Sequence, residues 1–136
     1  MKGLPTFIDN GAGIIQMMSA DKYAVLGSPI AHSKSPVIHR AILDHLGLDN
    51  EYLKLEVTDL QKFIKSHDEF LGLSLTMPLK VQPLTVATKV SDLALEAAAA
   101  NTLHWFEGIW CAENTDIFGL QQAAAQLQPK SVGVLG

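Results

Sequence analysis

From residue 22 onward, the apolar positions of the chain follow two periods that alternate. Runs of strand length, with apolar residues adjacent or at every second position, occur at residues 23–26, 52–57 and 71–76. Spacings of three and four residues, typical of amphipathic helices, occur at residues 36–46, 60–68, 91–100 and 116–128. A further helix is expected to begin around Pro78, just after the strand that ends near Thr76. The remaining segments predict a β-hairpin at 103–106 and 109–112, joined across Glu107-Gly108, and one more strand at 131–136.

The residues at the ends of these segments are typical of helix boundaries. Ser35 before Pro36 is expected to be the N-cap and the first residue of the helix, which Gly47 ends. The side of this helix expected to face inward comprises Val37, Ile38, Ala41, Ile42, His45 and Leu46. Expected caps of later helices are Thr58 or Asp59 and, further on, Thr115 or Asp116.

Strands and helices alternate over most of the chain, which predicts an α/β fold. We expect a mostly parallel open sheet with helices on both faces and one β-hairpin. Residues 1–21 have no clear period and are interpreted as an N-terminal extension, without the basic start and apolar core of a secretory signal. Residues 22–130 are expected to form one domain, and residues 131–136 the start of another.

Composition narrows the functional classes. The net charge of −4 and the pI near 5.6 argue against nucleic acid or an anionic membrane as a partner. The single cysteine, Cys111, has no partner for an internal disulfide, so a reducing cytoplasm and a buried thiol are expected. The sequence contains no apolar run of roughly 18 residues and no metal-ligand spacing, so neither a membrane span nor a metal site is expected.

Polar residues gather where predicted strands end or helices begin. The four clusters are Ser33/Ser35, Ser74/Thr76/Lys80, Asn101/Thr102 and Asn114/Asp116. Each cluster alone has a structural explanation as a helix cap, a helix stop or a polar strand end, and Lys80 alone could be a solvated surface lysine. In open α/β sheets, however, ligands bind outside the carboxyl ends of the strands, so the four clusters together predict one pocket.

Such a pocket suits a small polyhydroxylated acid. The helix N-terminus at Ser35 could hold a carboxylate, the amides could bind ring hydroxyls, and a lysine–aspartate pair could move a proton. Lys80 is expected in the first turn of the Pro78 helix, where the helix dipole disfavours a cation. Substrate and Asp116 would supply the compensating negative charge.

At these residues the sequence resembles the shikimate dehydrogenase family. Residues 27–36, Gly-Ser-Pro-Ile-Ala-His-Ser-Lys-Ser-Pro, are similar to the family's Gly-x-Pro-x-x-His-Ser-x-Ser-Pro signature. Residues 74–80, Ser-Leu-Thr-Met-Pro-Leu-Lys, are similar to its Asn-Val-Thr-x-Pro-x-Lys segment. Residues 100–103 and 114–116, with Gly119, match two later motifs, and order and spacing agree from residue 23 onward.

The resemblance implies a function for each of these residues. Ser33 and Ser35 would bind the carboxylate of shikimate. The ring would be bound by Ser74, Thr76, Lys80, Asn101 and Asp116. Lys80 and Asp116 would be the catalytic acid–base pair, moving a proton as hydride passes between NADPH and 3-dehydroshikimate. This reaction belongs to the biosynthesis of chorismate and the aromatic amino acids.

Two residues depart from the family pattern. Ser74 replaces a common asparagine, and because serine is shorter, its contact with a ring hydroxyl would run through water. Ala98 replaces a glycine that is common before the Asn-Thr pair. The presence of Ser33, Ser35 and Thr76 favours shikimate over quinate as the substrate.

The family also has a second, NADP-binding domain of the Rossmann type. Residues 132–136, Val-Gly-Val-Leu-Gly, resemble its first strand, but the chain has no Gly-x-Gly-x-x-Gly loop. We therefore expect this chain to be the substrate-binding and catalytic domain, inactive alone, with the NADP site beyond Gly136 and a homodimer at full length. The alternatives are a quinate/shikimate dehydrogenase that uses NAD and a non-catalytic shikimate- or quinate-sensing module. A sensor would not need to keep both Lys80 and Asp116.

Overall fold

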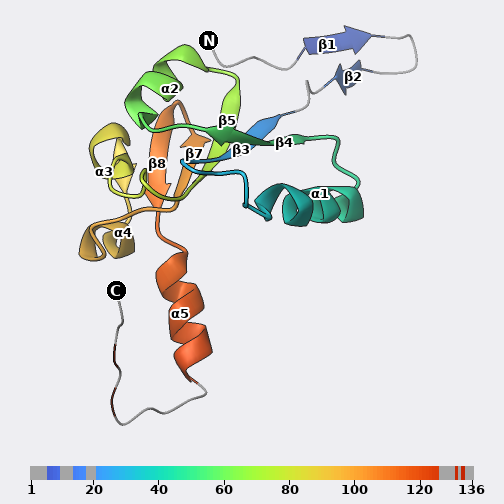
Figure 1. The fold of residues 1–136 in the computed structure, drawn as a ribbon. Helices are drawn as coiled ribbons and strands as arrows, with labels where there is room; N and C mark the ends of the chain where they lie inside the picture. The colour runs from blue at the N-terminus through green and yellow to red at the C-terminus, as the bar shows by residue number, and fades with distance from the viewer. Residues whose placement is uncertain (1–5, 10–13, 18–20, 126–130, 132, 134–136) are drawn as a thin grey trace.

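The computed structural model describes residues 6–9, 14–17, 21–125, 131 and 133 (Figure 1). Its centre is a six-stranded sheet in the order β4-β3-β5-β7-β8-β6. In that order the strands are Glu51–Glu56, Lys22–Gly27, Phe70–Leu75, Thr102–Phe106, Ile109–Glu113 and Lys89–Val90. The β4–β3, β3–β5 and β8–β6 pairs are parallel, whereas β5–β7 and β7–β8 are antiparallel. The predicted fold class, a mostly parallel open sheet with a hairpin, is confirmed.

Helices lie on both faces of the sheet, as Figure 1 shows. Their bounds are α1 Ser35–Leu46, α2 Leu60–Ser66, α3 Pro83–Val86, α4 Asp92–Glu96 and α5 Asp116–Ala125. The α1 helix packs against β3 and β4, α2 packs against α3, and α3 and α4 contact β8. The α5 helix begins at the edge of the sheet and projects away from it (Figure 1).

The hydrophobic core lies between the sheet and the α2–α4 side. Its largest fully buried side chains include Leu26, Leu60, Leu73, Leu79 and Leu103. Because side chains alternate between the two faces of a strand, the opposite face carries Tyr23, Tyr52 and Ser74, and it faces α1. Cys111 is buried at 5% exposure and unpaired, as expected for a small apolar side chain.

The hairpin was predicted correctly because its signal is local. Glu107 and Gly108 both have positive φ angles, 49° and 84°, as a two-residue turn between twisted strands requires. The predicted cap of α2 is also confirmed, since the Asp59 side chain accepts a hydrogen bond from the Lys62 amide at 2.9 Å.

The prediction of a helix beginning at Pro78 was wrong. The residues after β5 form tight turns, in which the amide of Leu79 donates to the carbonyl oxygen of Thr76 at 2.8 Å. The carbonyl oxygen of Lys80 accepts from the amide of Ala100 at 2.7 Å, so a distant backbone group takes the place of a helical hydrogen bond. Lys80 therefore lies in a turn, and the expected unfavourable interaction with a helix dipole does not occur.

The helix predicted at 91–100 is shorter than expected. The Ser91 side chain caps it by accepting from the Ala94 amide at 3.4 Å, but α4 ends at Glu96. Ala98 has a φ of 49°, which is a left-handed conformation that interrupts a right-handed helix. The alanine run is thus a connection to Asn101, despite its high helix propensity.

The start of α1 also differs from the prediction. Its N-cap is Lys34, without a side-chain capping bond, and Ser35 is the first helical residue. Gly47 ends the helix in the left-handed conformation with a φ of 67°, as predicted. At α5 the capping hydrogen bond comes from Asn114, whose side chain accepts from the Ile117 amide at 3.1 Å, and not from Thr115 or Asp116.

The buried side of α1 was predicted incorrectly. All six residues expected to face inward are exposed, including Val37 at 70%, Ile38 at 56% and Leu46 at 60%. The half-buried stripe contains Ser35, His39 and Leu43. His39 stacks on Tyr52 of β4 with ring centroids 3.9 Å apart, so a polar residue occupies the packed position and the apolar stripe is turned away from the sheet.

Short strands were not predicted. β6 pairs with β8 through two residues, too few to show a period. Within the expected extension 1–21, β1 (Thr6–Asp9) and β2 (Ile14–Met17) form a separate antiparallel pair. The predicted strand at 131–136 and the last turn of the final helix, residues 126–128, lie almost entirely outside the described residues. The expected domain boundaries stay predictions.

Candidate active site

The predicted site residues meet at one open cavity of about 640 Å³. It lies at the edge of the sheet where β3 and β5 end and β7 begins. Its lining includes all seven residues singled out from the sequence: Ser33, Ser35, Ser74, Thr76, Lys80, Asn101 and Asp116. Four separate stretches of sequence therefore converge, although the function of each residue stays a prediction.

Two serines line the cavity at the start of α1. Ser33 Oγ accepts from the backbone amide of Ser35 and donates to Ser35 Oγ, both at 3.3 Å. Both residues are partly buried. Two hydroxyl groups beside the positive end of a twelve-residue helix form a favourable environment for an anion.

A lysine and an aspartate form an ion pair elsewhere on the cavity wall. Lys80 Nζ donates to Asp116 Oδ2 at 2.6 Å. The other carboxylate oxygen, Oδ1, accepts from Asn101 Nδ2 at 2.9 Å. The two oxygens of Asp116 are thus bound by Lys80, in the turn after β5, and by Asn101, just before β7. These two contacts fix the plane of the carboxylate and the position of the Lys80 amine.

The side chain of Asn101 is fully engaged within the protein. Its amide group also donates to Thr115 Oγ1 at 2.8 Å, and its oxygen accepts from the Thr115 amide at 3.0 Å and from Thr102 Oγ1 at 3.1 Å. An amide side chain has two N–H donors and two acceptor lone pairs, so its capacity is filled. In this structure Asn101 orients Asp116, and a direct contact with a ring hydroxyl requires one of these hydrogen bonds to break.

Backbone contacts hold Thr76 and Lys80 at the cavity. The Thr76 amide donates to the carbonyl oxygen of Leu26 at 2.9 Å, which ties the turn after β5 to the end of β3. Leu79 is completely buried, and it anchors the turn in the core so that the adjacent Lys80 faces the cavity. The lysine is therefore positioned by its neighbours rather than by a helix.

Several lining residues were missed. His32 and Thr115 line the cavity and stand inside or beside the motifs already noted, so the motifs themselves were the available signal. Thr102, which the sequence analysis grouped with Asn101, lines the cavity as expected, whereas Asn114 of the fourth cluster does not line it. His39 lies four residues after Ser35, on the same side of α1, and this spacing could have indicated it. Its Nδ1 donates to the carbonyl oxygen of Ser35 at 2.9 Å.

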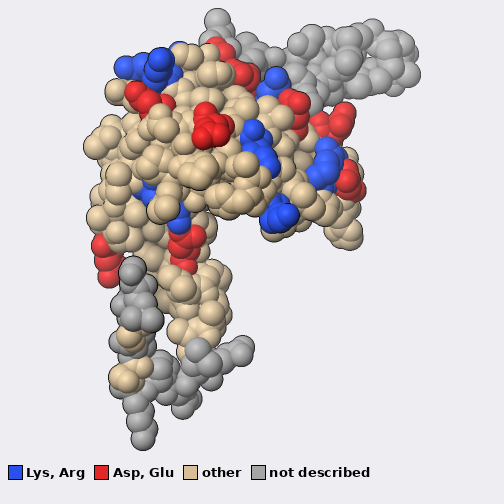
Figure 2. All heavy atoms as spheres, viewed as in Figure 1, with Lys and Arg blue, Asp and Glu red and all other residues tan. Residues whose placement is uncertain are grey.

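Charged side chains of both signs lie on the face drawn in Figure 2. Basic and acidic side chains are interspersed there instead of forming one large basic patch.

Among the described residues, no group of three His, Cys, Asp or Glu side chains is placed to hold a metal ion. In the same part of the chain, every helix is too short or too polar to cross a bilayer.

Comparison with known proteins assigns the chain to a family. The sequence profile of the shikimate dehydrogenase substrate binding domain matches residues 25–103. The NADP-dependent shikimate dehydrogenase of Methylobacillus flagellatus is 37% identical over 130 residues, covering 85% of this chain and 46% of that protein. The chain belongs to the shikimate dehydrogenase family, as the substrate-binding domain. The resemblance inferred from the motifs is therefore confirmed.

Solved structures agree with this assignment. A shikimate 5-dehydrogenase from Mycobacterium fortuitum superposes with a TM-score of 0.74 at 40% identity, covering 79% of this chain and 42% of that one. The enzyme from Thermus thermophilus, solved with NADP(H) and shikimate, gives a TM-score of 0.71 at 36% identity, covering 77% and 41%. The chain thus spans less than half the length of these relatives.

Proposed function

We propose that this chain is the substrate-binding and catalytic domain of an NADP-dependent shikimate dehydrogenase, which interconverts 3-dehydroshikimate and shikimate. The observation that carries the proposal is the 2.6 Å contact between Lys80 and Asp116 on a cavity that two serines also line. The family assignment supports the substrate class. A cytoplasmic location, supported by the single buried cysteine, and a homodimeric full-length enzyme are part of the same proposal.

In this proposal the cavity orients shikimate by its two ends. Ser33 and Ser35 hold the carboxylate at the start of α1, while Thr76 and Asp116 contact ring hydroxyls. A volume of about 640 Å³ lies within the range of small-molecule sites and leaves room for a second reactant. The open side of the cavity is where that reactant would approach.

Lys80 then supplies or removes the proton. When the carbonyl of 3-dehydroshikimate is reduced, its oxygen gains negative charge, and the Lys80 ammonium gives it a proton to form the hydroxyl. In the reverse direction the neutral amine accepts the hydroxyl proton as the carbon loses hydride. Asp116, fixed by Asn101, stabilises the ammonium form and keeps its N–H groups directed at the substrate oxygen.

NADPH, when bound, supplies the hydride. We assign no NADP-binding residues to the described part of the chain, because neither α1 nor α5 follows a glycine-rich loop: Ser33-Lys34 and Asn114-Thr115 precede them. In the proposed enzyme, the NADP site is contributed by residues outside this chain.

Binding of shikimate to the chain tests the proposal. NMR titration of the isotope-labelled protein with shikimate should perturb the amides of Ser33, Ser35 and Thr76 saturably, with quinate binding more weakly. The double change Ser33→Ala and Ser35→Ala should weaken binding at least about 10²-fold, since hydrogen bonds to a charged group are each worth roughly 1.5–3 kcal/mol. Ser66→Ala, at an exposed serine of α2, is the matched control. Absence of saturable shifts at millimolar shikimate would contradict the proposal.

A further inference from the structure

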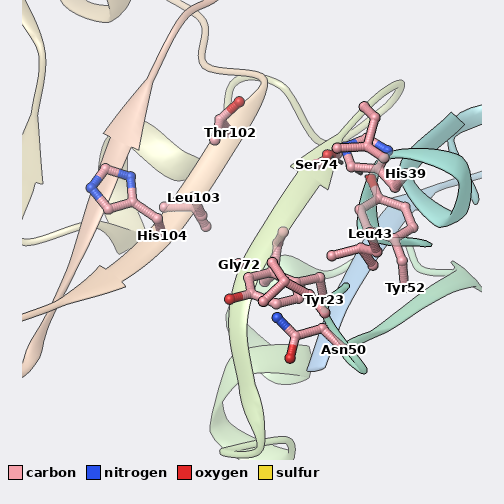
Figure 3. Close-up of a pocket in the computed structure, with 13 residues that line it drawn as sticks. Tyr23, His39, Leu43, Asn50, Tyr52, Gly72, Ser74, Thr102, Leu103 and His104 are labelled. Atoms are coloured by element: carbon pink, nitrogen blue, oxygen red, sulfur yellow. Dashed lines mark hydrogen bonds between the residues drawn. The ribbon is translucent and has the colours of Figure 1, made fainter. Parts of the chain in front are cut away.

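A tyrosine lies behind the active-site wall and contacts it through one serine. Tyr52 Oη donates to Ser74 Oγ at 2.7 Å, and Figure 3 shows the two side chains beside His39 of α1. Ser74 lines the active-site cavity, whereas Tyr52 lines a second, smaller cavity of about 340 Å³ on the same face of the sheet. Ser74 therefore stands between the two cavities, with Tyr52 on the side away from the proposed substrate.

The tyrosine is fixed in place by several contacts. Its ring stacks on His39 with an interplanar angle of 10°. His39 in turn donates a hydrogen bond from Nδ1 to the carbonyl oxygen of Ser35. Burial raises the pKa of the Tyr52 phenol above its ordinary value, and the hydroxyls of Ser74 and Ser35 partly offset this by lowering it. The phenol thus stays protonated at neutral pH, and a protonated phenol is a better hydrogen-bond donor than a serine hydroxyl.

The direction of this hydrogen bond decides what Ser74 can do. A serine hydroxyl has one hydrogen and two lone pairs. Because one lone pair accepts from Tyr52, the Ser74 hydrogen is left for another acceptor, and no such acceptor contacts it among the described residues. The Ser74 hydroxyl borders the active-site cavity, so its hydrogen is oriented to donate to a ligand bound there.

We infer that Tyr52 is a positioning residue that fixes Ser74 as a hydrogen-bond donor toward one ring oxygen of the substrate, whether the contact is direct or bridged by the water that the short serine side chain leaves room for. The inference rests on the proposed function and deepens it by naming how the ring is recognised at Ser74, where the family pattern has asparagine. Tyr52 itself does not touch the substrate. Its hydroxyl restricts the rotation of the Ser74 hydroxyl, so that less freedom is lost when the substrate binds.

Tyr52→Phe tests this inference because it removes only the hydroxyl and keeps the ring that stacks on His39. Shikimate affinity should fall about 3- to 10-fold, which is the worth of one neutral hydrogen bond. In a Ser74→Ala background the same change should reduce affinity clearly less, because Tyr52 acts on the ring through Ser74 and only its contact with the Ser35 hydroxyl remains to be lost. Tyr23→Phe is the matched control, since Tyr23 lines the second cavity but not the active site, and it should leave affinity unchanged.

Shikimate analogues that each lack one ring hydroxyl separate positioning from a merely structural effect. For one of these analogues, Tyr52→Phe should no longer reduce affinity, because the oxygen that Ser74 contacts is missing. If Tyr52→Phe weakens shikimate and every analogue equally, Tyr52 acts only on the structure and the inference is wrong.

A measurement without ligand tests the hydrogen bond itself. In the free protein, the ¹³Cζ resonance of Tyr52 should shift on Ser74→Ala and stay unchanged on Ser66→Ala. An unchanged resonance in both variants would overturn the inference, whether or not shikimate binds. A wild-type chain that does not bind shikimate would overturn the proposed function and the inference with it. Normal binding by Tyr52→Phe would overturn the inference alone.

Discussion

The amine of Lys80 lies 2.6 Å from a carboxylate oxygen of Asp116, a residue 36 positions further along the chain. The two side chains are 37% and 45% exposed. An ion pair with that much contact with water contributes at most about 1 kcal/mol to stability. The pair therefore adds little to the fold, and in the proposed function it serves proton transfer.

Asp116→Asn should reduce turnover while leaving the fold intact. The substitution keeps the shape of the side chain but removes the negative charge that stabilises the Lys80 ammonium. In a full-length dehydrogenase carrying this chain as its substrate-binding domain, we expect kcat to fall by about 10²-fold or more. The combined change with Lys80→Met should cost less than the product of the two single effects, because the residues act as a unit. If the two single effects multiply in the double variant, Lys80 and Asp116 act independently, and the proposed pairing is wrong.

The chain alone should not bind NADP. Fluorescence or calorimetric titration with NADP should give no saturable signal, and mixing with shikimate and NADP should give no nicotinamide reduction. The physical reason is that no helix of the described residues follows a glycine-rich loop that could receive a pyrophosphate. Saturable binding at micromolar NADP would mean that this chain contains a cofactor site.

Ala98→Gly should stabilise the protein. Ala98 has a φ of 49°, a conformation that costs an alanine roughly 1–2 kcal/mol and a glycine almost nothing. Part of this gain is offset because glycine has more freedom in the unfolded chain, so the net increase should be about 0.5–1 kcal/mol in urea unfolding. Ala97→Gly is the control: Ala97 has a φ of −74°, so only the entropic cost applies and stability should fall.

Gly27→Ala should destabilise the protein and disturb the site. A Cβ at Gly27 would clash with Thr76 Cγ2 and lie 2.8 Å from the carbonyl oxygen of Met77, so the turn after β5 would have to shift. We expect a loss of about 1–3 kcal/mol and weaker shikimate binding through Thr76. Gly119→Ala is the matched control, because space around that glycine of α5 is open and alanine favours a helix. A Gly27→Ala protein as stable as wild type would contradict the close packing described here.

Local signals in the sequence were sufficient for the hairpin and for α2. The Glu107-Gly108 turn and the Asp59 cap depend on neighbouring residues alone. The gathering of the four polar clusters was also predictable, because strand ends of an open sheet meet at one edge. Sequence order and spacing thus indicated the candidate site without knowledge of side-chain contacts.

Features that depend on distant contacts were not predictable. The helix expected to begin at Pro78 does not form, because the backbone amide of Ala100 donates a hydrogen bond to the carbonyl oxygen of Lys80. The apolar pattern of α1 suggested an inward face, yet His39 packs against the sheet because Tyr52, on another strand, offers a ring to stack on. Similarly, Asn101 was expected to meet the substrate, and its engagement with Thr115 and Asp116 became visible only in the folded chain.

The most direct test of the central claim is the turnover of Lys80→Met in the full-length dehydrogenase. We predict that kcat falls about 10²- to 10⁴-fold, the usual contribution of a positioned acid–base group. Shikimate binding should weaken far less, because Ser33 and Ser35 remain, and the free energy of unfolding should change by less than about 1 kcal/mol. Lys65→Met, at an exposed lysine of α2, should turn over normally. If Lys80→Met instead turned over at nearly the wild-type rate, Lys80 would not be the proton donor, and a sensing module would explain the site better.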